Sequence, residues 1–237
     1  ARSLVDRADA VFTGEDLATT RAARKLYTEA INKDPGLTSA WLGRSRTYSD
    51  EHWSNFSEGR NPRLLRDQDR DTLRALALDS LDARAWQARA NALSNQWQYD
   101  AAFEANDRAR ALDPTRFNLV LQRALLFILI GHAAEALETI ETRNAMVGSP
   151  DSDFLLSACH AHVHLGQFRD AIAKCGRAAV NGNDYWIYLD LTAAYAQTGD
   201  MVRAEAAKVE LMRLAPDFSI ARLEQKLGVD IRSRGNQ

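Results

Sequence analysis

Residues 83–116, ARAWQARANALSNQWQYDAAFEANDRARALDPTR, decide the fold of this chain. Small and apolar residues recur in this stretch at helical spacing. An Asp-Pro pair stands near its end, at 113–114, where proline cannot continue a helical hydrogen-bond ladder. Related endings occur upstream, as AINKDP at 30–35 and ALALDS at 75–80. Ala75 and Ala109 of these endings are 34 residues apart, so the sequence predicts a repeated helical unit of that length.

Two further series of residues have the same period. Small residues recur at Ala102, Ala136, Ala171 and Ala204, with spacings of 34, 35 and 33 residues. Glycines recur at Gly131, Gly166 and Gly199, with spacings of 35 and 33 residues. Three series with one period predict stacked helical hairpins, in which the small residues let the two helices of a hairpin approach closely.

The composition of the chain is consistent with this prediction. Among 237 residues there are only 12 Gly and 5 Pro, too few for a fold built on many tight turns. The formal net charge of −2 indicates no basic field for nucleic acid or for a membrane surface. The longest apolar run, ALLFILIG at 124–131, is too short to span a bilayer. The chain has no signal peptide and begins at Ala1 without Met, so we expect a fragment of a longer protein.

The repeats resemble the tetratricopeptide repeat, a 34-residue helix–turn–helix unit. In residues 83–116 the resemblance rests on Trp86, Ala90, Leu93, Ala102, Ala109 and Pro114. Asn106 departs from the pattern where a bulky residue is expected, and Arg143 replaces an alanine in the following repeat. The resemblance implies an all-α protein, a right-handed α-solenoid of these repeats with a C-terminal capping helix.

The repeat register predicts a single solenoid domain over residues 1–237. Irregular repeats are expected at 1–36 and 37–82, the second with an insertion near 52–63 in its inter-helix loop. Regular repeats are expected at 83–116, 117–150, 151–184 and 185–217. A capping helix within 218–228 is expected to cover the last hydrophobic face.

Candidate chemical sites are few, and each has a plainer interpretation. His160 and His164, four residues apart on one helix, could share a metal ion, but no third ligand is evident, so we expect groove-lining polar residues and no metal. Cys159 and Cys175 are expected to meet inside one hairpin, as a redox switch or, the interpretation we favour, as small core residues. No motif for a nucleotide, a catalytic metal or a nucleophile is present, so we predict a fragment without catalytic activity or cofactor.

The insertion holds two aromatic residues followed by arginines. Trp53 and Phe56 precede Arg60, Arg63 and Arg66, a combination that could grip a phosphate or a partner. Acidic residues follow at once and cancel the positive field. We favour a loop that packs its aromatic rings onto a neighbouring helix.

The resemblance also implies a concave groove that is lined by the first helix of each repeat and binds partners. The expected groove residues are Arg46, Arg84, Gln87, Asn91, Asn118, Leu121, Leu125, Ile128, Leu156, His160, His164, Trp186 and Leu189. Chaperone-tail binders of the family place a lysine at the fifth repeat position, where this chain has leucine or glutamine. The carboxylate clamp of those binders is therefore absent. The expected groove residues are polar at one end and apolar in the middle, and an exposed apolar patch is typical of an interface.

Three segments have a closer resemblance to the C-terminal repeat domains of bacterial signalling proteins with a class III adenylate or guanylate cyclase domain or a winged-helix domain. They are SLVDRADAVF at 3–12, LDSLDARAWQARANAL at 78–93 and APDFSIARLEQKLG at 215–228. The resemblance implies a regulatory, non-catalytic protein–protein interaction module. The alternatives are a homo-oligomerisation scaffold and a sensor of a small ligand or metal. We expect a protein or peptide partner or a second copy of the chain, a cytoplasmic location, and no nucleic-acid or membrane binding by this fragment.

Overall fold

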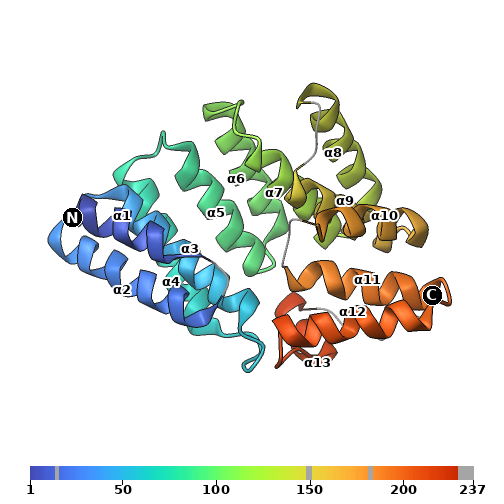
Figure 1. Ribbon diagram of the computed structural model, residues 1–237. Coiled ribbons are helices and arrows are strands. Elements are labelled where there is room, and N and C mark those ends of the chain that lie inside the picture. The colour runs from blue at the N-terminus through green and yellow to red at the C-terminus, as the bar shows by residue number, and fades with distance from the viewer. Residues whose placement is uncertain (14–15, 148–150, 181–183, 229–237) are drawn as a thin grey trace. The chain divides into compact units, whose positions relative to one another are not determined.

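The computed structural model describes residues 1–13, 16–147, 151–180 and 184–228 of the chain. All regular structure in these residues is helical, in thirteen helices, which confirms the predicted all-α solenoid class (Figure 1). The chain divides into two compact units according to its internal contacts. One unit comprises residues 1–114 and 217–237, and the other comprises residues 115–216. The expected single domain over 1–237 stays a prediction.

The first unit contains three helical hairpins and one further helix. Its helices are α1 (Arg2–Val11), α2 (Leu17–Lys33), α3 (Thr38–Ser54), α4 (Pro62–Leu78), α5 (Ala83–Asn95), α6 (Tyr99–Leu112) and α13 (Ile220–Leu227). Helices α1 and α2, α3 and α4, and α5 and α6 pack as successive pairs. Many of its core residues are small: Ala8, Ala23, Ala30 and Ala40 are fully buried in one cluster with Tyr27.

The second unit contains three further hairpins. Its helices are α7 (Asn118–Leu129), α8 (Ala133–Val147), α9 (Ser152–His164), α10 (Phe168–Ala178), α11 (Tyr185–Gln197) and α12 (Met201–Leu214). Each hairpin packs on the next, so α8 contacts α9 and α10 contacts α11. One hairpin cannot bury its apolar face alone, and this stacking completes the core.

Local sequence explains where the helices begin and end. Asp82, Asp184 and Asp200 each accept a backbone N–H at a helix start, which satisfies a donor that has no partner within the helix. Helices α6 and α12 end two residues before Pro114 and Pro216, since a residue preceding proline disfavours the helical conformation.

The two periodic series have the structural roles that their residue types indicate. Ala102, Ala136 and Ala171 are fully buried and Ala204 is nearly so, where the two helices of a hairpin touch. Gly131, Gly166 and Gly199 have φ angles of 85°, 69° and 83°, in the left-handed region that glycine adopts at low cost.

The insertion differs from its prediction. Residues 52–54 belong to the last turn of α3, and the loop between α3 and α4 is confined to residues 55–61. Both helices have 17 residues, so extra residues lengthen the hairpin rather than its loop. Asn61 begins α4 by accepting two backbone N–H groups, and Pro62 follows at the position where its missing N–H costs nothing.

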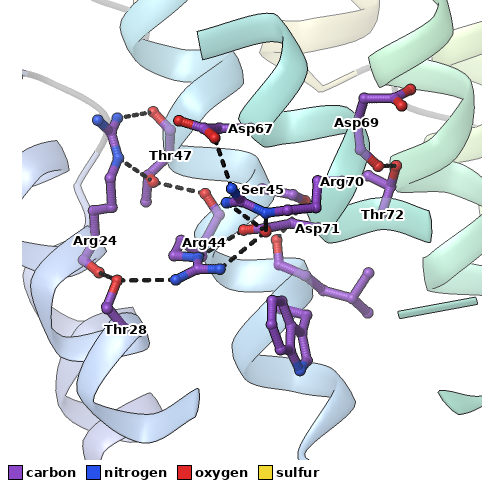
Figure 2. A network of polar contacts seen from close by, with 12 residues as sticks. Arg24, Thr28, Arg44, Ser45, Thr47, Asp67, Asp69, Arg70, Asp71 and Thr72 are labelled. Atoms are coloured by element: carbon purple, nitrogen blue, oxygen red, sulfur yellow. Dashed lines mark hydrogen bonds and ion pairs between the residues drawn. The ribbon is translucent and has the colours of Figure 1, made fainter. Parts of the chain in front are cut away.

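Helices α2, α3 and α4 are joined by a buried network of charged residues (Figure 2). Arg44 of α3 donates to both carboxylate oxygens of Asp71 on α4, at 2.6 and 2.9 Å. Arg24 of α2 donates to the side chain and the carbonyl oxygen of Thr47, at 2.9 and 2.7 Å. Because the Asp71 side chain is fully buried, this contact fixes the register of α3 against α4.

Helix α13 forms within the predicted residues, and that it covers the last hydrophobic face stays a prediction. It packs in the first unit, where Phe218 contacts the buried ring of Phe56 edge to face. Lys226 is 1% exposed, and its ammonium group donates to the backbone carbonyl of His52. Phe56 of the α3–α4 loop is therefore packed in the core, which agrees with the prediction that the loop packs its aromatic rings within the protein.

Trp97 occupies the turn position that glycine holds in the three later hairpins. Its φ angle is 63°, a conformation that costs an ordinary residue roughly 1–2 kcal/mol. Its indole N–H donates to the carbonyl of Lys226 at 3.2 Å, and the guanidinium of Arg60 lies over its ring. A Cβ on Gly228 would lie 2.5 Å from the same ring. Contacts with α13 therefore hold the strained turn.

Acidification is expected to destabilise the first unit through His52. Burial, together with the charges of Lys226 and Arg60, lowers the pKa of His52 from 6.5 to about 3. Unfolded chains then bind a proton at a pH where folded chains do not, so the free energy of unfolding falls as the pH drops from 6.5 towards 3. Urea unfolding at pH 7 and pH 5 measures this fall, and His52→Gln should reduce it. An unchanged pH dependence in that variant would exclude His52 as the cause.

Candidate partner-binding face

The first helices of the three hairpins in the second unit adjoin one another. Helix α7 contacts α9, and α9 contacts α11, in addition to the contacts within each hairpin. Predicted groove residues of this unit therefore lie on three neighbouring helices. They are Asn118, Leu121, Leu125 and Ile128 on α7, Leu156, His160 and His164 on α9, and Trp186 and Leu189 on α11.

The apolar part of this face centres on α7. Leu125 is 38% exposed and lies in the middle of this helix. Leu121 is half-buried against the core cluster of the α7–α8 hairpin, and Leu156 is half-buried against the cluster of α9–α11. Ile128 differs from its prediction, because it is 7% exposed and belongs to the core. We therefore remove Ile128 from the candidate surface.

A charged pair lies beside the apolar part. Nδ1 of His160 on α9 is 2.5 Å from a carboxylate oxygen of Asp190 on α11, and both side chains are largely buried. Burial by itself would lower the pKa of His160, but the carboxylate of Asp190 outweighs burial and raises this pKa above 6.5. The ring of Trp186 meets the imidazole edge to face at a centroid distance of 5.4 Å. The pair thus joins α9 to α11.

Two further acidic residues stand near this pair, at the start of α9 and before α11. Burial raises the pKa of Asp184, although a backbone N–H and His160 act in the opposite direction. Burial also raises the pKa of Asp153, with a smaller contribution from Asp151. The sequence pattern did not indicate Asp153, Asp184 or Asp190, because isolated acidic residues in an amphipathic helix carry no signal of their own.

The other predicted residues of this unit have ordinary environments. Asn118 is exposed at the start of α7, Leu189 is half-buried, and His164 is exposed one turn beyond His160. Nδ1 of His160 faces the carboxylate of Asp190, and the expectation that His160 and His164 share no metal ion stays a prediction.

The four remaining groove residues, all of them polar, lie in the first unit. The guanidinium of Arg46 stands over the ring of Phe12 at 4.7 Å, and Arg84 pairs with Asp82 at 2.7 Å. Gln87 is half-buried and Asn91 is exposed, both on α5. The two arginines are thus already engaged by neighbours within their own unit.

Cys159 and Cys175 meet inside the α9–α10 hairpin, as the repeat register predicts. They form a disulfide with a Cα–Cα distance of 5.4 Å, and both are fully buried. The favoured interpretation, two separate small core residues, is corrected in this respect. The pair is part of the core cluster and also a covalent link between α9 and α10.

Comparisons with known proteins give a likeness of fold. No family model matches the sequence, and no curated protein matches it in sequence. A TPR protein of the thermophile Thermus thermophilus superposes with a TM-score of 0.63, at 16% identity over 88% of this chain and 98% of that one. The type IV pilus biogenesis factor PilW gives 0.65, at 16% identity over 94% and 96%. PilF of Pseudomonas aeruginosa gives 0.59, at 19% identity over 94% and 95%.

None of the described helices combines the length and the apolar character needed to cross a membrane. The repeat period, the buried alanines and the left-handed turn glycines agree with the fold that these comparisons find. The chain therefore has the fold of a tetratricopeptide-repeat solenoid.

Proposed function

We propose that this chain is a non-catalytic protein–protein interaction module that binds its partner through the adjoining faces of α7, α9 and α11. One observation carries the proposal: α7, on which Leu125 is 38% exposed and Leu121 half-buried, adjoins α9, on which Leu156 is half-buried. Burial of exposed leucine surface against a partner stabilises the complex by about 25 cal/mol per Å² of apolar area removed from water.

The partner we propose is a protein or peptide segment with apolar side chains. A second copy of the chain is the alternative, because the same apolar surface can bury itself against its symmetry mate. The sequence resemblance to repeat domains of bacterial cyclases supports a narrower proposal, that partner binding regulates an output domain in a larger signalling protein. A cytoplasmic location belongs to this narrower proposal.

The variant Leu125→Glu tests the face. Placing a carboxylate there is expected to weaken self-association or partner binding at least ~10-fold, which corresponds to about 1.4 kcal/mol. Folding should persist, because the position is partly exposed in the free chain. Val202→Glu is the matched control, since Val202 is 83% exposed on α12 and should leave association unchanged.

The oligomeric state distinguishes the two kinds of partner. Light scattering measures the mass of the wild type and of Leu125→Glu. A dimeric wild type and a monomeric variant would support a second copy of the chain as the partner. If the chain is a monomer, a displayed peptide library provides the probe, and the selected peptide is titrated against both variants. Equal binding of that peptide by the wild type and by Leu125→Glu would contradict the proposed face, and unfolding of Leu125→Glu would show that Leu125 belongs to the core.

A further inference from the structure

Three helices of the second unit bring potential metal ligands to one point. The sulfur atoms of Cys159 on α9 and Cys175 on α10 and a carboxylate oxygen of Asp190 on α11 all lie within 4.8 Å of one another. Both cysteines are fully buried and Asp190 is 6% exposed. Within the described residues, this is the one group of three such ligands.

The position of the carboxylate is the unusual feature. The two sulfur atoms belong to an apolar core cluster, with Leu155, Ile187 and Leu191 among its buried members. A carboxylate in such a place is costly unless charges or hydrogen-bond donors stabilise it. A disulfide offers neither, because its sulfurs carry no proton and no positive charge. His160 stabilises Asp190, yet the disulfide gives no reason for a carboxylate beside the sulfurs.

We propose that Cys159, Cys175 and Asp190 form a divalent-metal site when the two cysteines are reduced, and that Zn²⁺ is the ion it fits. Two thiolates and one carboxylate are donors that Zn²⁺ accepts, and a water molecule completes four-coordination in sites with three protein ligands. His160 is a positioning residue, because its Nδ1 holds the Asp190 carboxylate from outside, as the outer partners of metal ligands do.

The disulfide and the metal site are alternative states of the same sulfur atoms. A thiol or phosphine reductant supplies two electrons, the S–S bond breaks, and each sulfur takes a proton. Binding of Zn²⁺ then forms two metal–sulfur bonds and one metal–oxygen bond and releases the two thiol protons to solvent. In the reverse step a small-molecule disulfide, such as oxidised glutathione, takes up two electrons and leaves as two thiols, while the Cys159–Cys175 S–S bond forms and the ion is expelled. The site is therefore open only under reducing conditions.

The sequence pattern predicted no metal because its one candidate pair was His160 with His164, on a single helix. The proposed ligands come from three helices and are 16 and 15 residues apart along the chain, and neither cysteine belongs to a CxxC pair that would mark a zinc motif in the sequence. The proposal does not depend on the partner-binding face, because the ligands lie in the core and Leu125 does not belong to their cluster.

Cobalt(II) titration of the purified chain tests the site. The protein is reduced with a phosphine, the reductant is removed, and the absorbance of thiolate-to-cobalt charge transfer is followed. One ion per reduced chain is expected, displaced by one equivalent of Zn²⁺, and none should bind the oxidised chain. Asp190→Asn should lower the affinity by at least about 10- to 100-fold, since loss of even an outer partner has that effect.

Three comparisons make the result decisive. His160→Gln should weaken binding less than Asp190→Asn does, and His164→Gln should not change it. Oxidised Asp190→Asn should still contain the disulfide, as shown by alkylation and mass spectrometry. If Asp190→Asn does not fold, the wild type still decides, because Zn²⁺ should slow alkylation of both buried thiols below the rate of the reduced, metal-free chain. No cobalt–thiolate band, no protection, or binding that depends on His164 would overturn the proposal.

Discussion

Replacing Asp71 with alanine is expected to lower the free energy of unfolding by about 3–5 kcal/mol, the cost of breaking a buried ion pair from one side. The Asp71 side chain is fully buried, and that of Arg44 is 10% exposed. Arg44 donates two hydrogen bonds to this carboxylate (Figure 2). Without Asp71, the guanidinium keeps its charge in the interior and loses the group that stabilises it there.

Urea unfolding measures the loss, and Glu205→Ala is the control. Glu205 pairs with Lys208 at 3.2 Å on the surface of α12, with 66% of its side chain exposed. Such a pair contributes only about 0–1 kcal/mol, because water screens it. The double variant Arg44→Met/Asp71→Leu should recover much of the stability, since it leaves no buried charge. Losses of equal size for Asp71→Ala and Glu205→Ala would contradict the buried network.

Gly43→Ala is expected to destabilise the chain by about 1–3 kcal/mol, although alanine is the better helix former. A Cβ at this position of α3 would lie 2.3 Å from the ring of Tyr27 on α2. That ring cannot move aside easily, because Tyr27 is 1% exposed and its hydroxyl donates to Asp9 of α1. The close approach of α2 and α3 therefore requires glycine.

Gly176→Ala is the matched control for this prediction. Gly176 lies within α10, and a Cβ there would have no neighbour within 4 Å. The same substitution should thus stabilise the chain by roughly 0.5–1 kcal/mol through helix propensity alone. Thermal unfolding of both variants gives the comparison. A stabilising effect of Gly43→Ala would show that α2 and α3 are further apart than the structure places them.

The helix register correctly predicted part of the candidate face on α7. Its prediction for the residue one turn further along this helix was wrong. Leu125 is partly exposed, as its position in the repeat indicates, whereas Ile128 is core. Successive helical residues turn by about 100° around the axis, so three positions make about 300°. The side chain of Ile128 therefore points some 60° away from that of Leu125 around the axis. That is enough to cross from the groove to the hairpin seam. The pattern of one helix does not show where this boundary lies, because the neighbouring helices set it.

Trp97 shows the same limit at a turn. Its position in the repeat period is that of Gly131, Gly166 and Gly199, and the period alone predicts glycine there. Tryptophan is tolerated because Lys226, 129 residues later in the chain, accepts the hydrogen bond of its indole. No local feature of residues 83–116 indicates that contact.

The sequence by itself determined the helical class, the repeat length, the hairpin turns and most helix ends. These features depend on backbone conformation within a few residues, on which glycine, proline, alanine and capping aspartates act directly. Tertiary structure alone decided that Asp71 neutralises Arg44, that Asp190 lies between His160 and the two sulfurs, and that α13 packs on Trp97. Charge pairing and ligand convergence depend on distances through space between separate helices, and a one-dimensional period contains no record of those distances.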